Sequence, residues 1–222
     1  MPDILDFGNN QGDQSKKVEP ADYDALVTVA SSIMSLCDAK GFKTLILQPF
    51  ANFEGWPDGS SERSDAFARL RGCMRIMEAA GTDMLQCWST HAPDWEDVWD
   101  ICKKVDRPNF GLCLDTFQSA GGEWADPTIE SGLVEDSRNA EQVEKDWKTL
   151  CAKLARAIPK DKILFLQISD AYRMQPPLAN QADDKGMRPR ARWSAAYRPL
   201  PYQGYLPCVD FARAVLQTGF RD

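Results

Sequence analysis

Polar side chains recur at the ends of four apolar runs that are typical of buried strands. Asp115 ends the run GLCLD, and Gln167 lies near the end of KILFLQIS. Glu54 follows the first run in a loop, and His91 follows the second. In parallel sheets and (β/α)₈ barrels, reactive groups gather at the carboxyl ends of strands. The oxygens of Asp115 and Gln167 suit a divalent ion, so both residues are candidate metal ligands.

Each of these residues also has a structural interpretation. A carboxylate at Asp115, directly before Thr116, is well placed to cap the N-terminus of a helix. Gln167 needs a hydrogen-bond partner in any case, because burying an unpaired amide costs roughly 1–3 kcal/mol. His91 is explained equally well as a loop hydrogen-bonding residue and as a proton carrier, since histidine titrates near neutral pH. The residue types alone leave these alternatives open.

Four arginines gather near the C-terminal end, at positions 188, 190, 192 and 198. An arginine binds a carboxylate through paired N–H donors, so this cluster could capture an acidic substrate. The alternative is that these arginines are exposed to solvent and bind no substrate. Arg198 is the member that we single out as a candidate substrate-binding residue.

The composition excludes several classes of function. The chain has 222 residues and one histidine, too few for a three-histidine zinc site, and GxSxG, GxGxxG and GxxxxGK[ST] motifs are absent. A net charge of −7 argues against binding to nucleic acid or to an anionic membrane. No apolar run approaches the roughly 18–20 residues of a membrane span, and no signal peptide is apparent. We therefore expect a cytoplasmic protein with seven reduced cysteines.

Helical and strand-like patterns alternate along the chain. After a flexible leader over residues 1–20, helices are predicted over 21–40, 62–80, 94–105, 139–158 and 209–216. Strands are predicted over 43–50, 83–88, 111–117 and 162–169, and a long irregular excursion over 171–207. In the second helix, the expected buried stripe is Phe67, Leu70, Cys73, Met74 and Met77. This alternation predicts a parallel α/β fold.

Several segments carry a resemblance to a known family. They are LQPFANFEGW (47–56), GTDMLQ (81–86), residues 90–127, ILFLQISDA (163–171) and residues 193–220. Together they resemble the fungal 3-dehydroshikimate dehydratases, which belong to the xylose isomerase-like TIM-barrel superfamily of sugar phosphate isomerases and epimerases. The resemblance implies a (β/α)₈ barrel over residues 21–222 and a lyase that converts 3-dehydroshikimate to protocatechuate in quinate and shikimate catabolism.

The resemblance also implies roles for individual residues. Asp115 and Gln167 match two of the family's four metal ligands, for a divalent ion such as Mg²⁺, Mn²⁺ or Co²⁺. His91 matches a Gly-Thr-His-like segment and is the candidate proton carrier. Arg198 matches an arginine of a Trp-Ser-rich loop, and Glu54 matches the glutamate of a Phe/Tyr-Glu-Gly motif; both are candidate substrate-binding residues.

The chain departs from the family pattern in three places. About four of eight barrel strands are identifiable, and the family's first two strands have no counterpart in the leader. In the family, a helix and a strand that carries one metal-binding glutamate would lie between the positions of Ser89 and Thr90. This chain lacks both elements, so we expect a gap at that point. The strand with the second glutamate is expected after Phe220. The alternatives to the dehydratase are therefore another isomerase- or epimerase-type enzyme, or a non-catalytic truncated paralogue that self-associates through open sheet edges.

Overall fold

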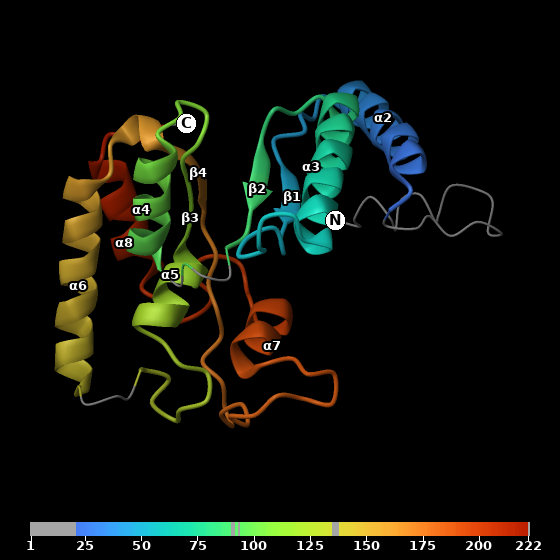
Figure 1. Cartoon of the computed structure of the whole chain (residues 1–222). Coiled ribbons are helices and arrows are strands. Elements are labelled where there is room, and N and C mark those ends of the chain that lie inside the picture. The colour runs from blue at the N-terminus through green and yellow to red at the C-terminus, as the bar shows by residue number, and fades with distance from the viewer. Residues whose placement is uncertain (1–20, 90–91, 93, 135–137, 222) are drawn as a thin grey trace. The chain divides into compact units, whose positions relative to one another are not determined.

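A computed structural model describes residues 21–89, 92, 94–134 and 138–221. The predicted flexible leader lies outside the described residues. The chain divides into two compact units, residues 1–90 and 91–222 (Figure 1). The boundary falls one residue beyond the predicted gap between Ser89 and Thr90. Each unit is described by itself.

The first unit consists of two helices and a pair of parallel strands. Its elements are α2 (Tyr23–Ala39), β1 (Leu47–Phe50), α3 (Ser61–Ala80) and β2 (Leu85–Cys87). The Ser60 hydroxyl accepts a hydrogen bond from Arg63 N and so caps α3, and Gly81 ends this helix in the left-handed conformation, at φ 69°. Both helices lie on one side of the strand pair (Figure 1).

The predicted buried stripe of α3 is wrong at two of its five positions, and the other three, Leu70, Cys73 and Met77, are half-buried. Phe67 and Met74 are 50% and 59% exposed, whereas the buried positions include Ala66 and Gly72. The reason is the close approach of α2, because a Cβ added at Gly72 would lie 2.2 Å from Cε1 of Tyr23. Gly72 therefore lies against α2, and Ile76 packs with Leu26 of that helix, while Phe67 and Met74 lie on the exposed side of α3.

The second unit places its long helices on one side of a parallel strand pair. Its elements are α4 (Trp95–Val105), β3 (Leu112–Asp115), α5 (Thr116–Glu123), α6 (Ala140–Ala157), η1 (Lys160–Lys162), β4 (Ile163–Gln167), α7 (Pro189–Ala196) and α8 (Cys208–Gln217). Strands β3 and β4 pair in parallel, with Leu114 opposite Leu166 and Asp115 opposite Gln167. Helices α4, α6 and α8 cover one side of this pair (Figure 1).

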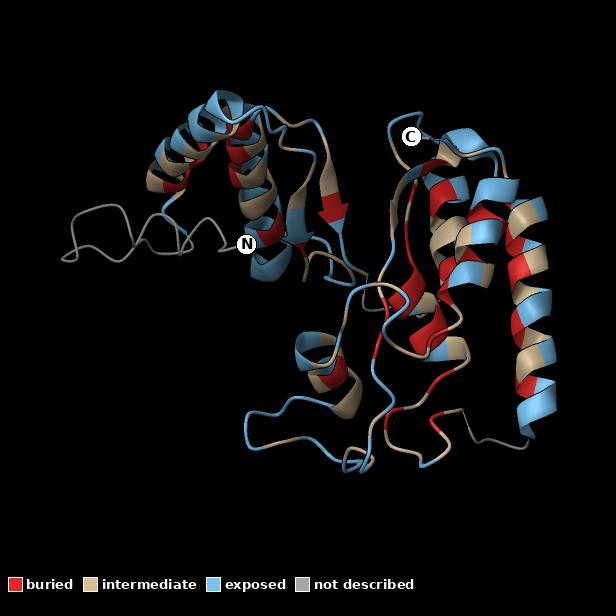
Figure 2. Ribbon diagram, turned by 180° about the vertical axis from the view of Figure 1, so that it is seen from behind, coloured by how far each residue is buried: buried red, intermediate tan, exposed pale blue. Residues whose placement is uncertain are grey.

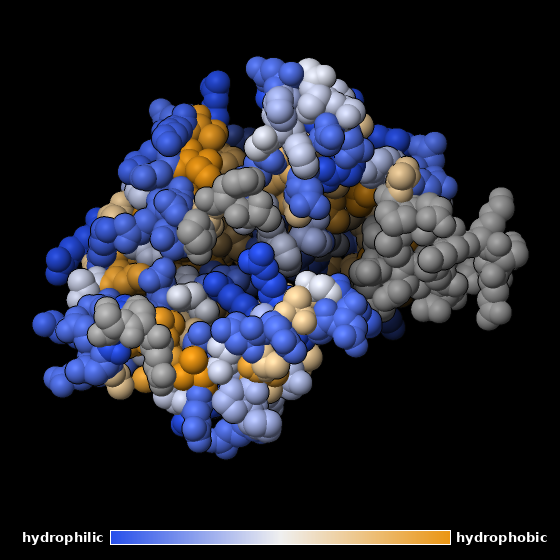
Figure 3. Space-filling model, turned by 60° about the horizontal axis from the view of Figure 1, so that its bottom comes forward, coloured by the Kyte–Doolittle hydropathy of each residue, from blue (hydrophilic) through white to orange (hydrophobic). Residues whose placement is uncertain are grey.

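The core of the second unit lies between these helices and the strands. Its largest fully buried side chains are Phe117, Trp147, Trp193 and Phe211. Trp147 of α6 stacks against Phe211 of α8 with ring centroids 6.0 Å apart. Figure 2 shows the buried residues along the inner faces of the helices and along β3. The face drawn in Figure 3 is largely hydrophilic, with hydrophobic patches among the hydrophilic residues.

All four predicted strands are present, and both pairs are parallel as expected. Two short helices were not predicted. Helix α5 contains Gly121 and Gly122, which disfavour helix in isolation, and it forms because Asp115 caps it and Phe117 anchors it in the core. Helix α7 lies within the predicted irregular excursion and has Pro189 at its first position. No helix of the described residues is long and apolar enough to cross a membrane.

Candidate functional site

Asp115 is the last residue of β3 and the N-cap of α5. Its Oδ1 accepts hydrogen bonds from the backbone N–H groups of Phe117, at 2.7 Å, and Gln118, at 3.3 Å. The hydroxyl of Ser169 donates a further hydrogen bond to the same oxygen at 2.8 Å. These donors replace water around a carboxylate that is only 9% exposed. The helix-capping interpretation of Asp115 is confirmed.

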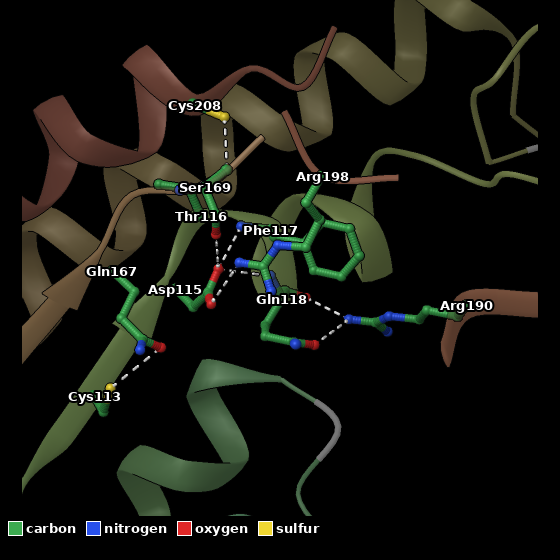
Figure 4. A network of polar contacts seen from close by, with 10 residues as sticks. All are labelled: Cys113, Asp115, Thr116, Phe117, Gln118, Gln167, Ser169, Arg190, Arg198 and Cys208. Atoms are coloured by element: carbon green, nitrogen blue, oxygen red, sulfur yellow. Dashed lines mark hydrogen bonds and ion pairs between the residues drawn. The ribbon is translucent and has the colours of Figure 1, made fainter. Parts of the chain in front are cut away.

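Strand β4 brings Gln167 next to this carboxylate. Gln167 and Asp115 are partners in the parallel pairing of β3 and β4. The thiol of Cys113, two residues before Asp115, lies 3.8 Å from Gln167 Oε1. Figure 4 shows these side chains along the same strand pair. The structure therefore brings the two candidate metal ligands to neighbouring strand ends, as their sequence positions predict.

A second link joins the two strand ends and was not predicted. The Thr116 hydroxyl donates to the Ser169 carbonyl at 2.5 Å and accepts from the Ser169 N–H at 2.8 Å. Ser169 stands two residues after Gln167, just beyond the end of β4, and the alternation of the strand predicted over 162–169 places both side chains on the same face. That spacing was the available signal for a role of Ser169 at this site.

Arg198 reaches the same carboxylate from the loop after α7. Its Nη2 lies 3.4 Å from Asp115 Oδ2, which gives an ion pair whose side chains are 30% and 10% exposed. The guanidinium also lies over the ring of Phe117, 4.6 Å from its centroid. The structure thus assembles Asp115, Gln167 and Arg198, three of the five residues singled out from the sequence (Figure 4).

Arg190 places a second positive charge near this strand end. Its Nη2 donates to the backbone carbonyl of Gln118 at 2.6 Å and to the side-chain oxygen of Gln118 at 3.3 Å. Burial lowers the pKa of Arg190, and the neighbouring carboxylates of Glu123 and Asp115 oppose this effect. A guanidinium remains protonated in proteins, so the region around α5 carries two fixed cations.

Glu54 and His91 are the two remaining candidates from the sequence. Glu54 is half-buried in the loop after β1, in the first unit. Arg69 fixes this loop by donating to the carbonyls of Ala51, at 2.9 Å, and Asn52, at 2.7 Å. His91 lies outside the described residues, so its predicted catalytic role stays a prediction.

The metal site implied by the resemblance is incomplete in the described part of the chain. Asp115 and Gln167 offer oxygen donors, but one oxygen of Asp115 accepts three hydrogen bonds and the other faces Arg198. The described residues contain no group of three or more histidine, cysteine or acidic side chains that could hold a metal ion. The residues present therefore do not fit a divalent metal centre by themselves.

Comparison with solved structures identifies the class of fold. The chain superposes on a xylose isomerase-like TIM barrel/4-hydroxyphenylpyruvate dioxygenase fusion protein with a TM-score of 0.61, at 19% sequence identity, over 86% of this chain and 31% of that protein. The fold is therefore of the xylose isomerase-like TIM-barrel type. With two pairs of strands among the described residues, it corresponds to an incomplete barrel.

Comparison with characterised sequences is more specific. The chain is 27% identical to the 3-dehydroshikimate dehydratase of Neurospora crassa, over 96% of this chain and 71% of that enzyme. It is 23% identical to the 3-dehydroshikimate dehydratase of Pseudomonas putida, over 92% of this chain but 32% of that enzyme. No family model matches the chain. The predicted resemblance to 3-dehydroshikimate dehydratases is confirmed along nearly the whole chain.

The Neurospora comparison also reveals extra length in the relative. The aligned region extends over 262 positions, which is 40 more than the 222 residues of this chain. The Neurospora enzyme therefore has at least 40 residues within the aligned region that have no counterpart here.

Proposed function

We propose that this chain acts on 3-dehydroshikimate and that the strand end of the second unit binds the substrate carboxylate through Arg198. The observation that carries the proposal is the position of Arg198. It lies at the carboxyl end of a parallel strand pair, where barrel enzymes bind substrates, in a chain that resembles dehydratases of this substrate.

Arg198 has more N–H donors than its contact with Asp115 uses. Asp115 balances its charge, and the ring of Phe117 covers one face of the guanidinium. The contact with Asp115 involves Nη2, and a guanidinium has five N–H donors in a fixed planar arrangement. Arg198 can therefore donate to a substrate carboxylate while it keeps its contact with Asp115.

The proposed reaction needs a base as well as a binding site. Dehydration removes the proton next to the ketone, the electron pair of that C–H bond forms a ring double bond, and hydroxide leaves and is protonated to water. The saturated ring carbon that remains then loses a proton and the ketone oxygen gains one, which makes the ring aromatic. His91 is the proposed proton carrier, because histidine exchanges protons near neutral pH. Glu54 is proposed to contact the substrate hydroxyl groups. The product of this reaction is protocatechuate.

A divalent ion, Mg²⁺, Mn²⁺ or Co²⁺, belongs to the proposal as a cofactor that this chain does not hold by itself. Asp115 and Gln167 would supply two of its oxygen ligands. Two oxygen donors bind a divalent ion weakly, because such ions take six or more ligands in proteins. We derive no catalytic step through this ion.

A second candidate function is binding of the carboxylate without turnover. The 40-position difference from the Neurospora enzyme and the incomplete metal site favour it. We also propose that the chain is cytoplasmic and that its two-stranded parallel sheets promote self-association, since the described strands leave sheet edges unpaired. Sedimentation velocity at two protein concentrations tests the proposed self-association.

The experiment that separates the two functions uses the full chain, 3-dehydroshikimate, and Mg²⁺, Mn²⁺ or Co²⁺. Calorimetry measures binding and absorbance measures formation of protocatechuate. Binding with turnover supports the dehydratase, and binding without turnover supports the non-catalytic protein. If the folded chain does not bind 3-dehydroshikimate, the proposed substrate is wrong.

A further inference from the structure

Asp170 is a buried carboxylate that the proposed reaction does not use. It follows β4 closely in the sequence and is only 2% exposed. A buried charge is tolerated when hydrogen bonds replace the lost water. The contacts of Asp170 therefore indicate what its charge does in the fold.

Asp170 binds three backbone N–H groups. Its Oδ1 accepts from Ala171 at 2.8 Å and from Leu206 at 3.0 Å. Its Oδ2 accepts from Gly204 at 3.0 Å. Two of these donors belong to the segment after α7, so one carboxylate joins the end of β4 to a segment more than 30 residues away in the sequence.

Backbone hydrogen bonds extend this connection toward Arg198. The N–H of Tyr205 donates to the Ala171 carbonyl at 3.1 Å, and the N–H of Tyr172 donates to the Tyr197 carbonyl at 3.0 Å. Tyr197 is the residue directly before Arg198. Residues 197–206, here called the arginine loop, are therefore held along residues 170–172 at both ends.

The approach of the arginine loop to Asp170 is close enough to require a glycine. A Cβ added at Gly204 would lie 2.3 Å from both Asp170 Oδ1 and the Ala171 carbonyl oxygen. Between the two ends of the loop, Leu200 and Tyr202 are 70% and 74% exposed, so burial of these side chains does little to hold it.

We propose that Asp170 is a positioning residue that holds the arginine loop so that Arg198 reaches Asp115. Residues directly after β4 then position both Asp115 and Arg198. Ser169 donates to Asp115 directly, and Asp170 acts on Arg198 through the loop backbone. The inference concerns the Arg198 site of the proposed function, but it can be tested without a substrate.

The test measures how fast the full-length protein reacts with phenylglyoxal, which modifies arginine, with the modified residues located by mass spectrometry. Asp170→Asn keeps the size of the side chain but replaces one acceptor oxygen with an amino group. Loss of a hydrogen bond to a charged group corresponds to a factor of about ten. We expect Arg198 to react up to about tenfold faster in this variant, while Arg213 on α8 reacts at the wild-type rate.

Two further variants separate positioning from general destabilisation. Gly204→Ala keeps Asp170 but pushes the arginine loop away from it, so it should accelerate the reaction at Arg198 as well. The matched control is Asp210→Asn, because Asp210 lies on α8 and pairs with Arg213. This variant should leave the reaction rate of Arg198 unchanged. An unchanged rate at Arg198 in either Asp170→Asn or Gly204→Ala would overturn the proposal.

Substrate binding provides a second, separate readout. In an Arg198→Ala background, Asp170→Asn should not weaken 3-dehydroshikimate binding further, because its effect passes through Arg198. If the wild-type chain does not bind 3-dehydroshikimate, the proposed function fails, while the phenylglyoxal result still decides the role of Asp170.

Discussion

Asp115 and Arg198 are 83 residues apart in the sequence, and their side chains form an ion pair at 3.4 Å. The pair joins the end of β3 to the arginine loop and lies beside Gln167, the register partner of Asp115. The negative charge of Asp115 is therefore stabilised within the fold, by the backbone N–H groups of α5 and by Arg198. This relationship leads to the first two predictions.

Replacing Arg198 should weaken binding of 3-dehydroshikimate without unfolding the protein. We expect Arg198→Ala to lower affinity by about 10- to 100-fold, the range for loss of charged hydrogen bonds, with a smaller loss for Arg198→Lys. Calorimetry measures the affinity, and Arg213→Ala on α8 is the control. Equal affinities for Arg198→Ala and wild type would contradict the assigned role.

Replacing Asp115 should separate its two structural roles. Asp115→Asn retains an oxygen that can cap α5, whereas Asp115→Ala removes the cap and should lower the free energy of unfolding by about 1–2 kcal/mol. Both variants remove the partner charge of Arg198. Urea unfolding monitored by tryptophan fluorescence measures the difference, and equal stability of Asp115→Ala and wild type would show that the cap contributes nothing.

Buried thiols should make the protein less stable at alkaline pH. Burial raises the pKa of Cys151 to about 12 and that of Cys208 to about 11, from an ordinary value of 9.0. Below pH 9 both thiols are protonated whether the chain is folded or not. As the pH rises above 9, the unfolded chain releases protons that the folded chain retains, so unfolding becomes more favourable.

The measurement is the free energy of unfolding from about pH 8 to about pH 11, a range that begins below the ordinary thiol pKa and ends well above it. In Cys151→Ala the decline should be shallower than in the wild type, although the variant is less stable at every pH. Cys37→Ala is the control, because this cysteine is not fully buried. An identical pH dependence of Cys151→Ala and wild type would refute the prediction.

Arg192 should stabilise the segment before α7. Its guanidinium donates to the backbone carbonyls of Ala179, at 2.8 Å, Gln181, at 3.0 Å, and Met187, at 3.3 Å. Arg192→Ala should therefore speed limited proteolysis within residues 179–187, since those carbonyls lose their donor. The control is Arg188→Ala, because Arg188 is exposed and lies nearby in the sequence. This variant should be cleaved at the wild-type rate. Equal cleavage of both variants would exclude this role.

All four predicted strands and all five predicted helices are present among the described residues, and the short helices α5 and α7 were missed. Four apolar runs identified the strands, although helices cover only one side of each strand pair and only β3 is largely buried. The adjacency of Asp115 and Gln167 followed from the strand-end rule. Helix α5 was missed because its two glycines disfavour helix, and the cap that overcomes this preference is a tertiary arrangement.

Other parts of the site depend on contacts that local patterns do not encode. The Ser169–Asp115 hydrogen bond requires the register of β3 and β4, which the sequence does not specify. The position of Arg198 depends on the hydrogen bonds of Asp170 to a segment more than 30 residues later. Phe67 and Met74 of α3 are exposed although they were predicted as buried, because periodicity shows an apolar face but not which neighbour covers it.

The cap that Asp115 provides for α5 has an evolutionary consequence. In a lineage that has lost its catalytic function, purifying selection for folding alone would retain this aspartate, because α5, Ser169 and Arg198 all depend on it. Invariance of Asp115 among related chains is then expected in active enzymes and in inactive descendants alike. Gln167 is only a proposed metal ligand and its side chain caps no helix, so its replacement among related chains would be the better marker of a lost metal site.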